Sequence, residues 1–223
     1  DTQRQASKPR IAGEPQLAPS FGAANSLQRS VIAPAFKRSS QLLTMAHVGI
    51  MRVNHDTKEK QRFEALFSRP FNAARYTTVK TNLKRIHDVV CARDITLYYR
   101  ANDMPAQRAN DTPEFLTNLG AQAAPSTAFG YVYPNAQRPG EWHMFLGSAF
   151  FGDRAGRREG FDSMSGVYIH ELSHLICRTK DHRYGLQNCV ALAAANAGQA
   201  VENADSYEYY CESFQKQILR RFG

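Results

Sequence analysis

The stretch of sequence that decides the fold is Ser163-Met-Ser-Gly-Val-Tyr-Ile-His-Glu-Leu-Ser-His-Leu-Ile-Cys177. Its apolar residues recur at helical spacing, and Asp162 or Ser163 can cap the first turn by accepting hydrogen bonds from free backbone N–H groups. We therefore predict a helix that runs to about Cys177. Part of this helix should be buried in the core, because three of its apolar residues fall on one stripe. These residues are Tyr168, Leu172 and Leu175.

The same stretch contains His170-Glu171-Leu172-Ser173-His174, an HExxH motif. Residues four apart on a helix lie one turn apart on the same face, so both imidazoles can bind one metal ion. Glu171 lies beside them and can take a proton from an attacking water molecule. The motif therefore predicts a catalytic zinc site, with His170 and His174 as ligands and Glu171 as the general base.

A catalytic zinc ion needs a third protein ligand and an open position. The longer pattern HExxHxxGxxH is excluded, because Cys177 and Lys180 stand where it needs glycine and histidine. Asp181 follows the motif closely enough for the chain to fold back to the metal. Glu202, on a later helix, is the alternative third ligand, and it would make the site one of the gluzincin type.

The rest of the chain favours an α+β fold. Residues 1–38 are rich in Gln, Ser, Ala and Pro, which predicts an extended or partly disordered N-terminal arm, such as the remnant of a pro-region. Residues 39–223 are predicted to form one domain of helices, a small antiparallel-type sheet and further helices. The predicted strands are Ile95–Tyr99, Gly130–Tyr133 and His143–Phe151, and the predicted later helices are Tyr184–Ala195 and Ser206–Arg221.

Composition limits the class of protein. The chain has 223 residues, of which 43% are hydrophobic and 22% charged, as is typical of a globular protein. No apolar run approaches the ~20 residues of a membrane span. The net charge of +8 is uneven, with +10 on residues 1–110 and −2 on residues 111–223. The basic half leaves a rival interpretation open, a non-catalytic binding module that contacts an anionic surface. No nucleic-acid motif stands out, so we expect no nucleic-acid partner.

The cysteines are Cys91, Cys177, Cys189 and Cys211. Their even number permits disulfides in an oxidising compartment, with the pairing left open, and buried thiols are the alternative. If the protein works outside the cell, we expect one bridge among the last three of them. No CxxC pair is present, so a thiolate zinc ribbon is not expected.

The HExxH motif and the stretch that follows it, Thr179-Lys-Asp-His-Arg-Tyr-Gly185, resemble the aspzincin metallopeptidases of the deuterolysin and peptidyl-Lys metalloendopeptidase type. The segments 128–135 and 200–209 are similar to further parts of that family. The resemblance covers about residues 40–215 and implies a zincin-like metalloprotease domain. Arg178 is a departure, since it stands where the family usually has glycine before the threonine.

The resemblance also implies roles for single residues. His170, His174 and Asp181 would bind one zinc ion per chain, and Glu171 would be the general base. Tyr184 would donate a hydrogen bond to the oxyanion of the tetrahedral intermediate. The family would therefore make this chain a secreted or exported zinc endopeptidase, which we expect to be a monomer.

The expected substrate is a protein or peptide with lysine after the cut bond. Asp205 and Glu208 match the acidic positions that line the family's pocket for that lysine (S1′). They are three residues apart, so on a helix they share a face and can direct two carboxylates into one pocket. We also expect an exposed strand, such as 143–151, to pair with the extended substrate.

Overall fold

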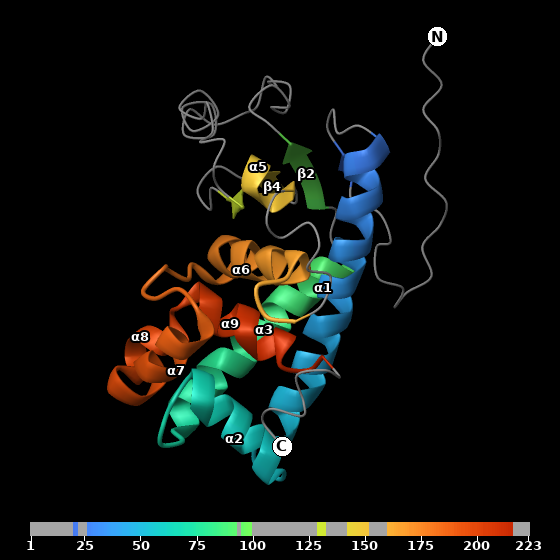
Figure 1. The fold of residues 1–223 in the computed structure, drawn as a ribbon. Coiled ribbons are helices and arrows are strands. Elements are labelled where there is room, and N and C mark those ends of the chain that lie inside the picture. Colours follow the sequence, from blue (N-terminus) through green and yellow to red (C-terminus); the bar gives the residue numbers. More distant parts are fainter. Residues whose placement is uncertain are drawn as a thin grey trace, which may run out of the picture.

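The computed structural model describes residues 20–21, 26–92, 95–99, 129–132, 142–151 and 160–215. These residues form a mostly helical molecule with a small sheet (Figure 1). The helices are α1 (Ser26–Arg52), α2 (Thr57–Leu66), α3 (Ala73–Ala92), α5 (Ser148–Phe151), α6 (Met164–Cys177), α7 (Leu186–Ala195), α8 (Ala197–Val201) and α9 (Ala204–Glu212). The strands are β1 (Ser20–Phe21), β2 (Ile95–Tyr99), β3 (Gly130–Tyr131) and β4 (Trp142–Leu146).

The sheet has the strand order β1-β2-β4-β3, and it is mixed. β1 pairs with β2 and β2 pairs with β4 in parallel, whereas β3 pairs antiparallel with β4, with Gly130 opposite Leu146. The predicted antiparallel-type sheet is therefore wrong, because two of the three observed pairings are parallel. Parallel neighbours need a long crossover connection, and residues 100–141 between β2 and β4 are numerous enough to provide one.

Several predicted boundaries are also wrong, and the helix predicted over Ser206–Arg221 is α9, which ends at Glu212. The strand predicted over His143–Phe151 ends at Leu146, and α5 begins directly after Gly147. The arm predicted over residues 1–38 is helical from Ser26 onward, while residues 1–19 lie outside the described part of the chain. Helix α1 continues through Pro34 because Ile32 and Phe36, four residues apart, both pack into the core.

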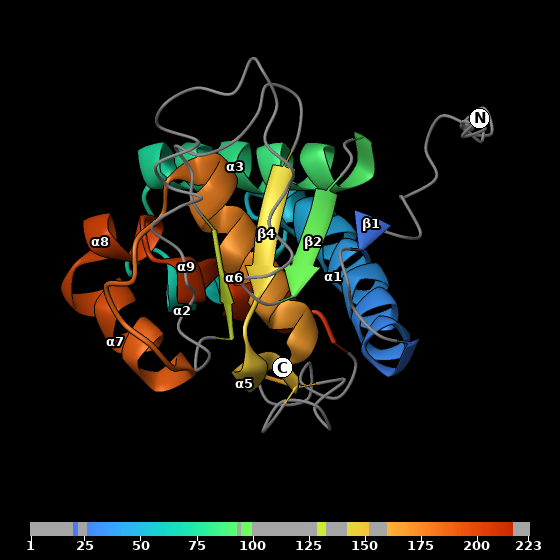
Figure 2. The same ribbon diagram turned by 90° about the horizontal axis from the view of Figure 1, so that it is seen from above.

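Helix α6 is the central element of the fold. It lies beneath the sheet and packs against α1, α3 and α9 (Figures 1 and 2). Tyr168 is fully buried and contacts Phe36 and Phe150 edge to face, with ring centroids 5.6 and 5.4 Å apart. Leu172 and Leu175 are also buried, which confirms the predicted apolar stripe. The two histidines of the motif lie on the other side of α6, since they are about half a turn from Tyr168 and Leu172.

Both ends of α6 are fixed by specific contacts. Ser163, one of the two predicted candidates, is the N-cap, and its Oγ accepts a hydrogen bond from the Gly166 amide at 3.0 Å. The Ser163 amide and hydroxyl in turn donate to the buried carboxylate of Glu212 on α9. Arg178 ends the helix with a left-handed backbone, φ 60° and ψ 34°, a conformation that favours glycine.

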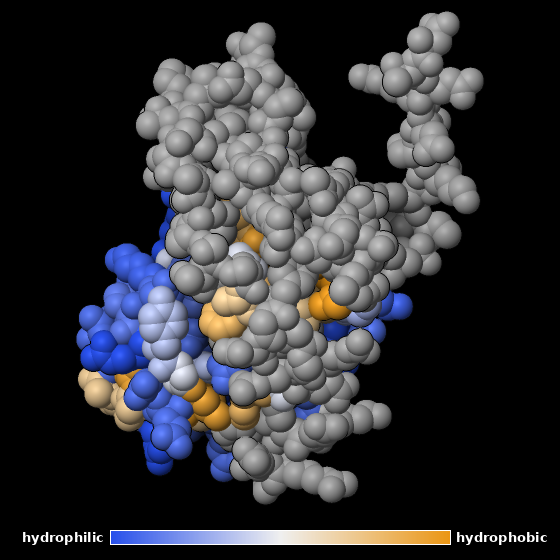
Figure 3. Space-filling view, turned by 45° about the horizontal axis from the view of Figure 1, so that its top comes forward, coloured by the Kyte–Doolittle hydropathy of each residue, from blue (hydrophilic) through white to orange (hydrophobic). Residues whose placement is uncertain are grey.

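In Figure 3 hydrophilic residues gather over the left of the molecule, and apolar residues show nearer its centre. Among the described residues, no helix is both long enough and apolar enough to cross a membrane.

All four cysteines are free thiols, so the bridge expected among the last three is not formed. Cys177 Sγ donates to the carbonyl of Asn82 on α3, and Cys189 Sγ lies 3.3 Å from the side-chain amide of Asn203. Burial raises the pKa of both thiols to about 12, which keeps them protonated and unreactive.

We therefore expect four thiols per chain when the denatured, unreduced protein is titrated with a thiol reagent. The same number should be found after reduction, because there is no disulfide to open. A count of two or none in the unreduced sample would contradict the separate positions of these side chains.

Candidate metal centre and active site

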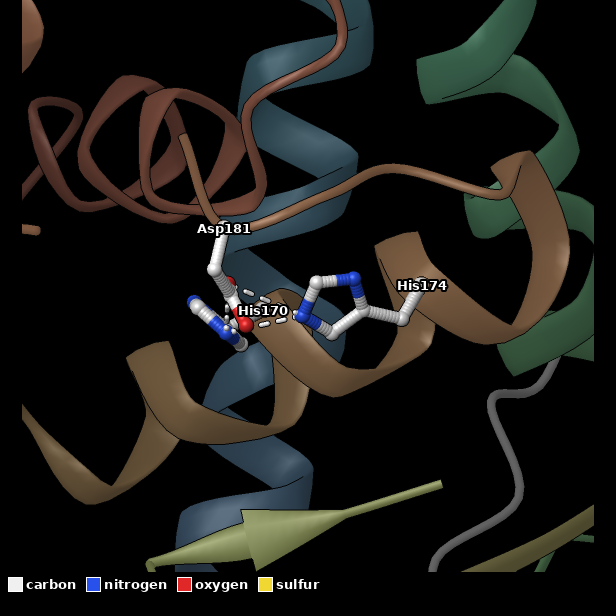
Figure 4. A group of neighbouring side chains, drawn as sticks. All are labelled: His170, His174 and Asp181. Carbon is white, nitrogen blue, oxygen red and sulfur yellow. Dashed lines mark hydrogen bonds and ion pairs between the residues drawn. The ribbon is translucent and has the colours of Figure 1, made fainter. Parts of the chain in front are cut away.

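The two motif histidines and Asp181 converge on one point (Figure 4). The Nε2 atoms of His170 and His174 are 3.1 Å apart. Asp181 Oδ1 lies 3.2 Å from His170 Nε2 and 3.1 Å from His174 Nε2. One turn of α6 thus presents two nitrogen donors, and the following loop adds one oxygen donor.

The three donor atoms fit a zinc ion. Zinc bonds of 2.0–2.1 Å to nitrogen and oxygen in a tetrahedron place neighbouring donors about 3.3 Å apart. The observed separations of 3.1–3.2 Å are close to that value. Three protein donors also leave a fourth position open, as a catalytic site requires.

Each histidine is held by a hydrogen bond at its other ring nitrogen. His170 Nδ1 lies 2.8 Å from Asp205 Oδ1 and 3.4 Å from Glu208 Oε2. His174 Nδ1 lies 2.8 Å from the carbonyl oxygen of Thr179. A proton on each Nδ1 leaves both Nε2 atoms as metal donors, which is the usual way proteins orient such ligands.

Asp181 owes its position to a backbone pairing between the loop and the start of α9. The Lys180 amide donates to the Glu202 carbonyl at 2.7 Å, and the Ala204 amide donates to the Lys180 carbonyl at 2.9 Å. The buried side chain of Asn203 accepts a further hydrogen bond from the Arg183 amide. The loop is thereby fixed on both sides of Asp181.

Glu202, the alternative third ligand, is excluded by its position. Its side chain is 57% exposed and pairs with Lys180 at 3.5 Å and with His182 at 3.7 Å, and it is not among the described residues that line the site. Its backbone carbonyl, rather than its carboxylate, contributes to the site, because it accepts the hydrogen bond that holds the loop at Lys180. The gluzincin-type arrangement is therefore wrong.

Glu171 is buried, with 6% of its surface exposed, and it borders the same cavity as the histidines. Gly130 of β3 packs directly against it, since a Cβ there would lie only 2.9 Å from Glu171 Cγ. Burial raises the pKa of the Glu171 carboxyl, although the nearby histidines oppose this. A raised pKa makes the carboxylate a stronger base.

Tyr184 lies at the mouth of the site. Its ring stacks on that of His170, with centroids 6.4 Å apart and an angle of 13° between the planes, and 62% of its surface is exposed. Desolvation and the neighbouring Asp181 carboxylate raise the pKa of the phenol to about 12. The hydroxyl therefore keeps its proton near neutral pH and can act as a donor.

The histidines and carboxylates of the site stabilise each other's charged forms. Burial alone would raise the pKa of Asp181, but its hydrogen bonds to both histidines outweigh burial and lower it. Burial alone would lower the pKa of His170, but Asp181, Asp205 and Glu208 outweigh burial and raise it. The carboxylates around the two histidines therefore favour the binding of a cation.

These groups open into a cavity of about 610 Å³. Of the described residues that line it, five carry carboxylates and none is Lys or Arg. The lining residues are Phe129, Gly130, Val132, Asp162, Val167, His170, Glu171, His174, Asp181, Tyr184, Gly185, Asp205, Glu208 and Tyr209. Apart from the alternative ligand Glu202, all the residues predicted for the site are thus brought together. Two contributions gave no signal in the sequence: the Thr179 carbonyl that holds His174, and the close packing of Gly130 against Glu171.

The comparisons with known proteins agree with this geometry. Residues 52–212 match the family model for aspzincins, described as lysine-specific metallo-endopeptidase. The match covers well over half of the chain, so the chain belongs to the aspzincin family. The resemblance inferred from the HExxH motif and the loop after it is confirmed, and the family takes zinc as its cofactor.

Curated relatives match over shorter stretches. The chain is 38% identical over 90 residues to a peptidyl-Lys metalloendopeptidase of Armillaria mellea, covering 40% of this chain and 24% of that protein. It is 33% identical over 126 residues to a peptidyl-Lys metalloendopeptidase of Grifola frondosa, covering 56% and 33%. An extracellular protease of Aeromonas hydrophila is 26% identical over 160 residues, covering 71% and 37%. The matches thus span about a quarter to just over a third of the length of these relatives.

A solved structure shares the fold. The zinc peptidase from Grifola frondosa superposes with a TM-score of 0.59 at 24% sequence identity, over 85% of this chain and 97% of that one. At this identity the likeness concerns the fold alone.

Proposed function

We propose that this chain is a zinc-dependent endopeptidase that hydrolyses peptide bonds in proteins, with lysine preferred after the cut bond. The observation that carries the proposal is the convergence of His170, His174 and Asp181 in the cavity that also holds Glu171. A non-catalytic binding module would have no need of a buried general base beside three metal donors. Membership of the aspzincin family supports the same conclusion.

The chemistry follows from the positions of the chain's own side chains. Zinc, when bound, supplies Lewis acidity that polarises the scissile carbonyl and favours ionisation of water near neutral pH. Glu171 takes the proton from the attacking water and passes it to the leaving amine. Tyr184 donates its phenolic hydrogen to the carbonyl oxygen as negative charge develops there.

The edge strand β3 is the element suited to align a substrate. The sequence favoured the segment 143–151 for this task, but β4 is hydrogen-bonded on both sides and has no free edge. Within the described sheet β3 is an outer strand, and Gly130 brings it against Glu171. An extended peptide added to β3 would place its backbone beside the general base.

The preference for lysine rests on the charge of the cavity. Asp205 and Glu208 line it together, as the family resemblance implies, and both are almost fully buried. Desolvated carboxylates attract an ammonium group far more strongly than exposed ones do. The names of the relatives from Armillaria mellea and Grifola frondosa are consistent with this preference.

We expect a digest of a mixed proteome to yield new peptides that begin mainly with lysine, as read by mass spectrometry of their N-termini. The long stem of lysine reaches buried carboxylates, whereas arginine needs a flat bidentate partner, so arginine should be less frequent. New peptides that begin mostly with apolar residues would reject the lysine pocket and leave the metal chemistry standing.

We further propose that the protein is secreted or exported and acts as a monomer on protein or peptide substrates. The extracellular protease of Aeromonas hydrophila supports the location. Activity in the medium of the producing cells, absent from washed cell extract, would test it.

A further inference from the structure

Asp162 is a carboxylate of the cavity for which the sequence suggested only a capping role. Ser163 is the N-cap of α6, so the helix does not need Asp162 for that purpose. Instead, Asp162 lines the cavity next to Tyr209, whose hydroxyl donates to Asp162 Oδ1 at 2.7 Å. The side chain is therefore directed by α9 and not by the helix that it precedes.

The backbone of Asp162 is held in an unusual conformation. Its φ of 58° lies in the left-handed region, where residues other than glycine are uncommon. The Asp162 amide donates to Glu212 Oε2 at 3.1 Å, which fixes this conformation from α9. Residues held in such conformations by their surroundings are concentrated at functional sites.

Asp205 is already engaged by the protein through both of its carboxylate oxygens. Oδ1 lies 2.8 Å from His170 Nδ1, and Oδ2 accepts a hydrogen bond from the Gly185 amide at 2.7 Å. Asp205 thus positions a metal ligand and the residue after Tyr184. A lysine ammonium has three N–H donors, so acceptors besides Asp205 are needed to satisfy it.

We propose that Asp162 is a specificity-determining residue that accepts the ammonium group of the substrate lysine together with Glu208. Val167, His170 and His174 line the cavity from one face of α6, and Asp162, which also lines it, precedes the first turn of that helix. A lysine stem that enters beside His170 and follows this path brings its ammonium toward the Asp162 end. The inference rests on the proposed function, since it concerns the same cavity.

The test replaces Asp162 with asparagine. Asparagine tolerates a left-handed backbone, keeps an acceptor for the Tyr209 hydroxyl and removes only the charge. Two peptides are compared that differ only after the cut bond, one with lysine and one with norleucine, its neutral analogue. We expect the lysine-to-norleucine ratio of kcat/KM to fall at least tenfold in Asp162→Asn, mainly through a higher KM for the lysine peptide.

Two further variants sharpen the test. Tyr209→Phe removes the hydroxyl that orients Asp162, so it should lower the same ratio by a smaller factor. Asp88→Asn on α3 makes the same change of charge at an exposed residue paired with Lys84, and it should leave the ratio unchanged. If Asp88→Asn lowers the ratio as much as Asp162→Asn does, the effect is one of overall charge and the proposal is wrong.

The remaining outcomes also decide the matter. An unchanged ratio in Asp162→Asn, whether both peptides slow equally or neither does, overturns the proposal for Asp162 and leaves the peptidase standing. A wild-type protein that cleaves both peptides equally well overturns the lysine pocket as a whole. A wild-type protein loaded with zinc that cleaves neither these peptides nor a mixed proteome overturns the proposed function as well.

Discussion

Replacing Glu171 with alanine should lower kcat for peptide hydrolysis at least about 100-fold, because loss of a general base typically costs that much or more. Glu171 is the one carboxylate of the HExxH motif, and it borders the cavity without belonging to the three-donor group of His170, His174 and Asp181. Zinc should therefore remain bound at one ion per chain. Activity is measured by release of a fluorescent peptide fragment and zinc by atomic absorption.

Glu171→Gln is the matched control for this experiment. It preserves the volume next to Gly130, where Glu171 packs closely, and replaces the basic carboxylate with a neutral amide. Both variants should lose activity to a similar degree while their thermal unfolding stays near that of the wild type. A Glu171→Gln protein that retains more than about a tenth of the activity would exclude Glu171 as the base.

Asp181→Ala should weaken zinc binding strongly, whereas Glu202→Ala should not change it. Asp181 supplies the one oxygen donor beside the two histidine nitrogens, and its loss removes one of three protein ligands. The loss of affinity should exceed the roughly 10–100-fold that follows removal of a residue which only orients a ligand. Competition with a chromogenic chelator measures the dissociation constant of each variant.

Glu202→Ala is an informative control because Glu202 is close to Asp181 in space but faces outward to Lys180 and His182. The backbone hydrogen bond from Lys180 to the Glu202 carbonyl remains in that variant. If Glu202→Ala strips the metal while Asp181→Ala retains it, the geometry of the centre is wrong.

The core of the site could be predicted from sequence because its spacing is local. His170 and His174 lie on one face of a helix by its periodicity alone, and a short loop brings Asp181 back to them. The partners of the ring nitrogens were not predictable in the same way. Asp205 reaches His170 from another helix, and Thr179 reaches His174 through a backbone carbonyl that no side-chain pattern reveals.

The fold was predicted unevenly for a similar reason. Helix α6, with its cap at Ser163 and its end at Cys177, agrees with the local pattern. The direction of strand pairing depends on the path of residues 100–141, which the pattern of β2 and β4 does not encode. Helix α1 was predicted to begin too late, because proline-rich composition outweighed the spacing of Ile32 and Phe36.

The pairing of Lys180 with the start of α9 has a consequence for how the centre acquires its ion. A chelating site normally gives up chain entropy when a loop closes on the metal. Here the Lys180 and Ala204 amides close that loop during folding, so the oxygen of Asp181 stands in place beforehand. Zinc then binds to donors that are already preorganised, so no loop has to be ordered at the moment of binding. Protein emptied by a chelator should accordingly regain zinc without passing through an unfolded state.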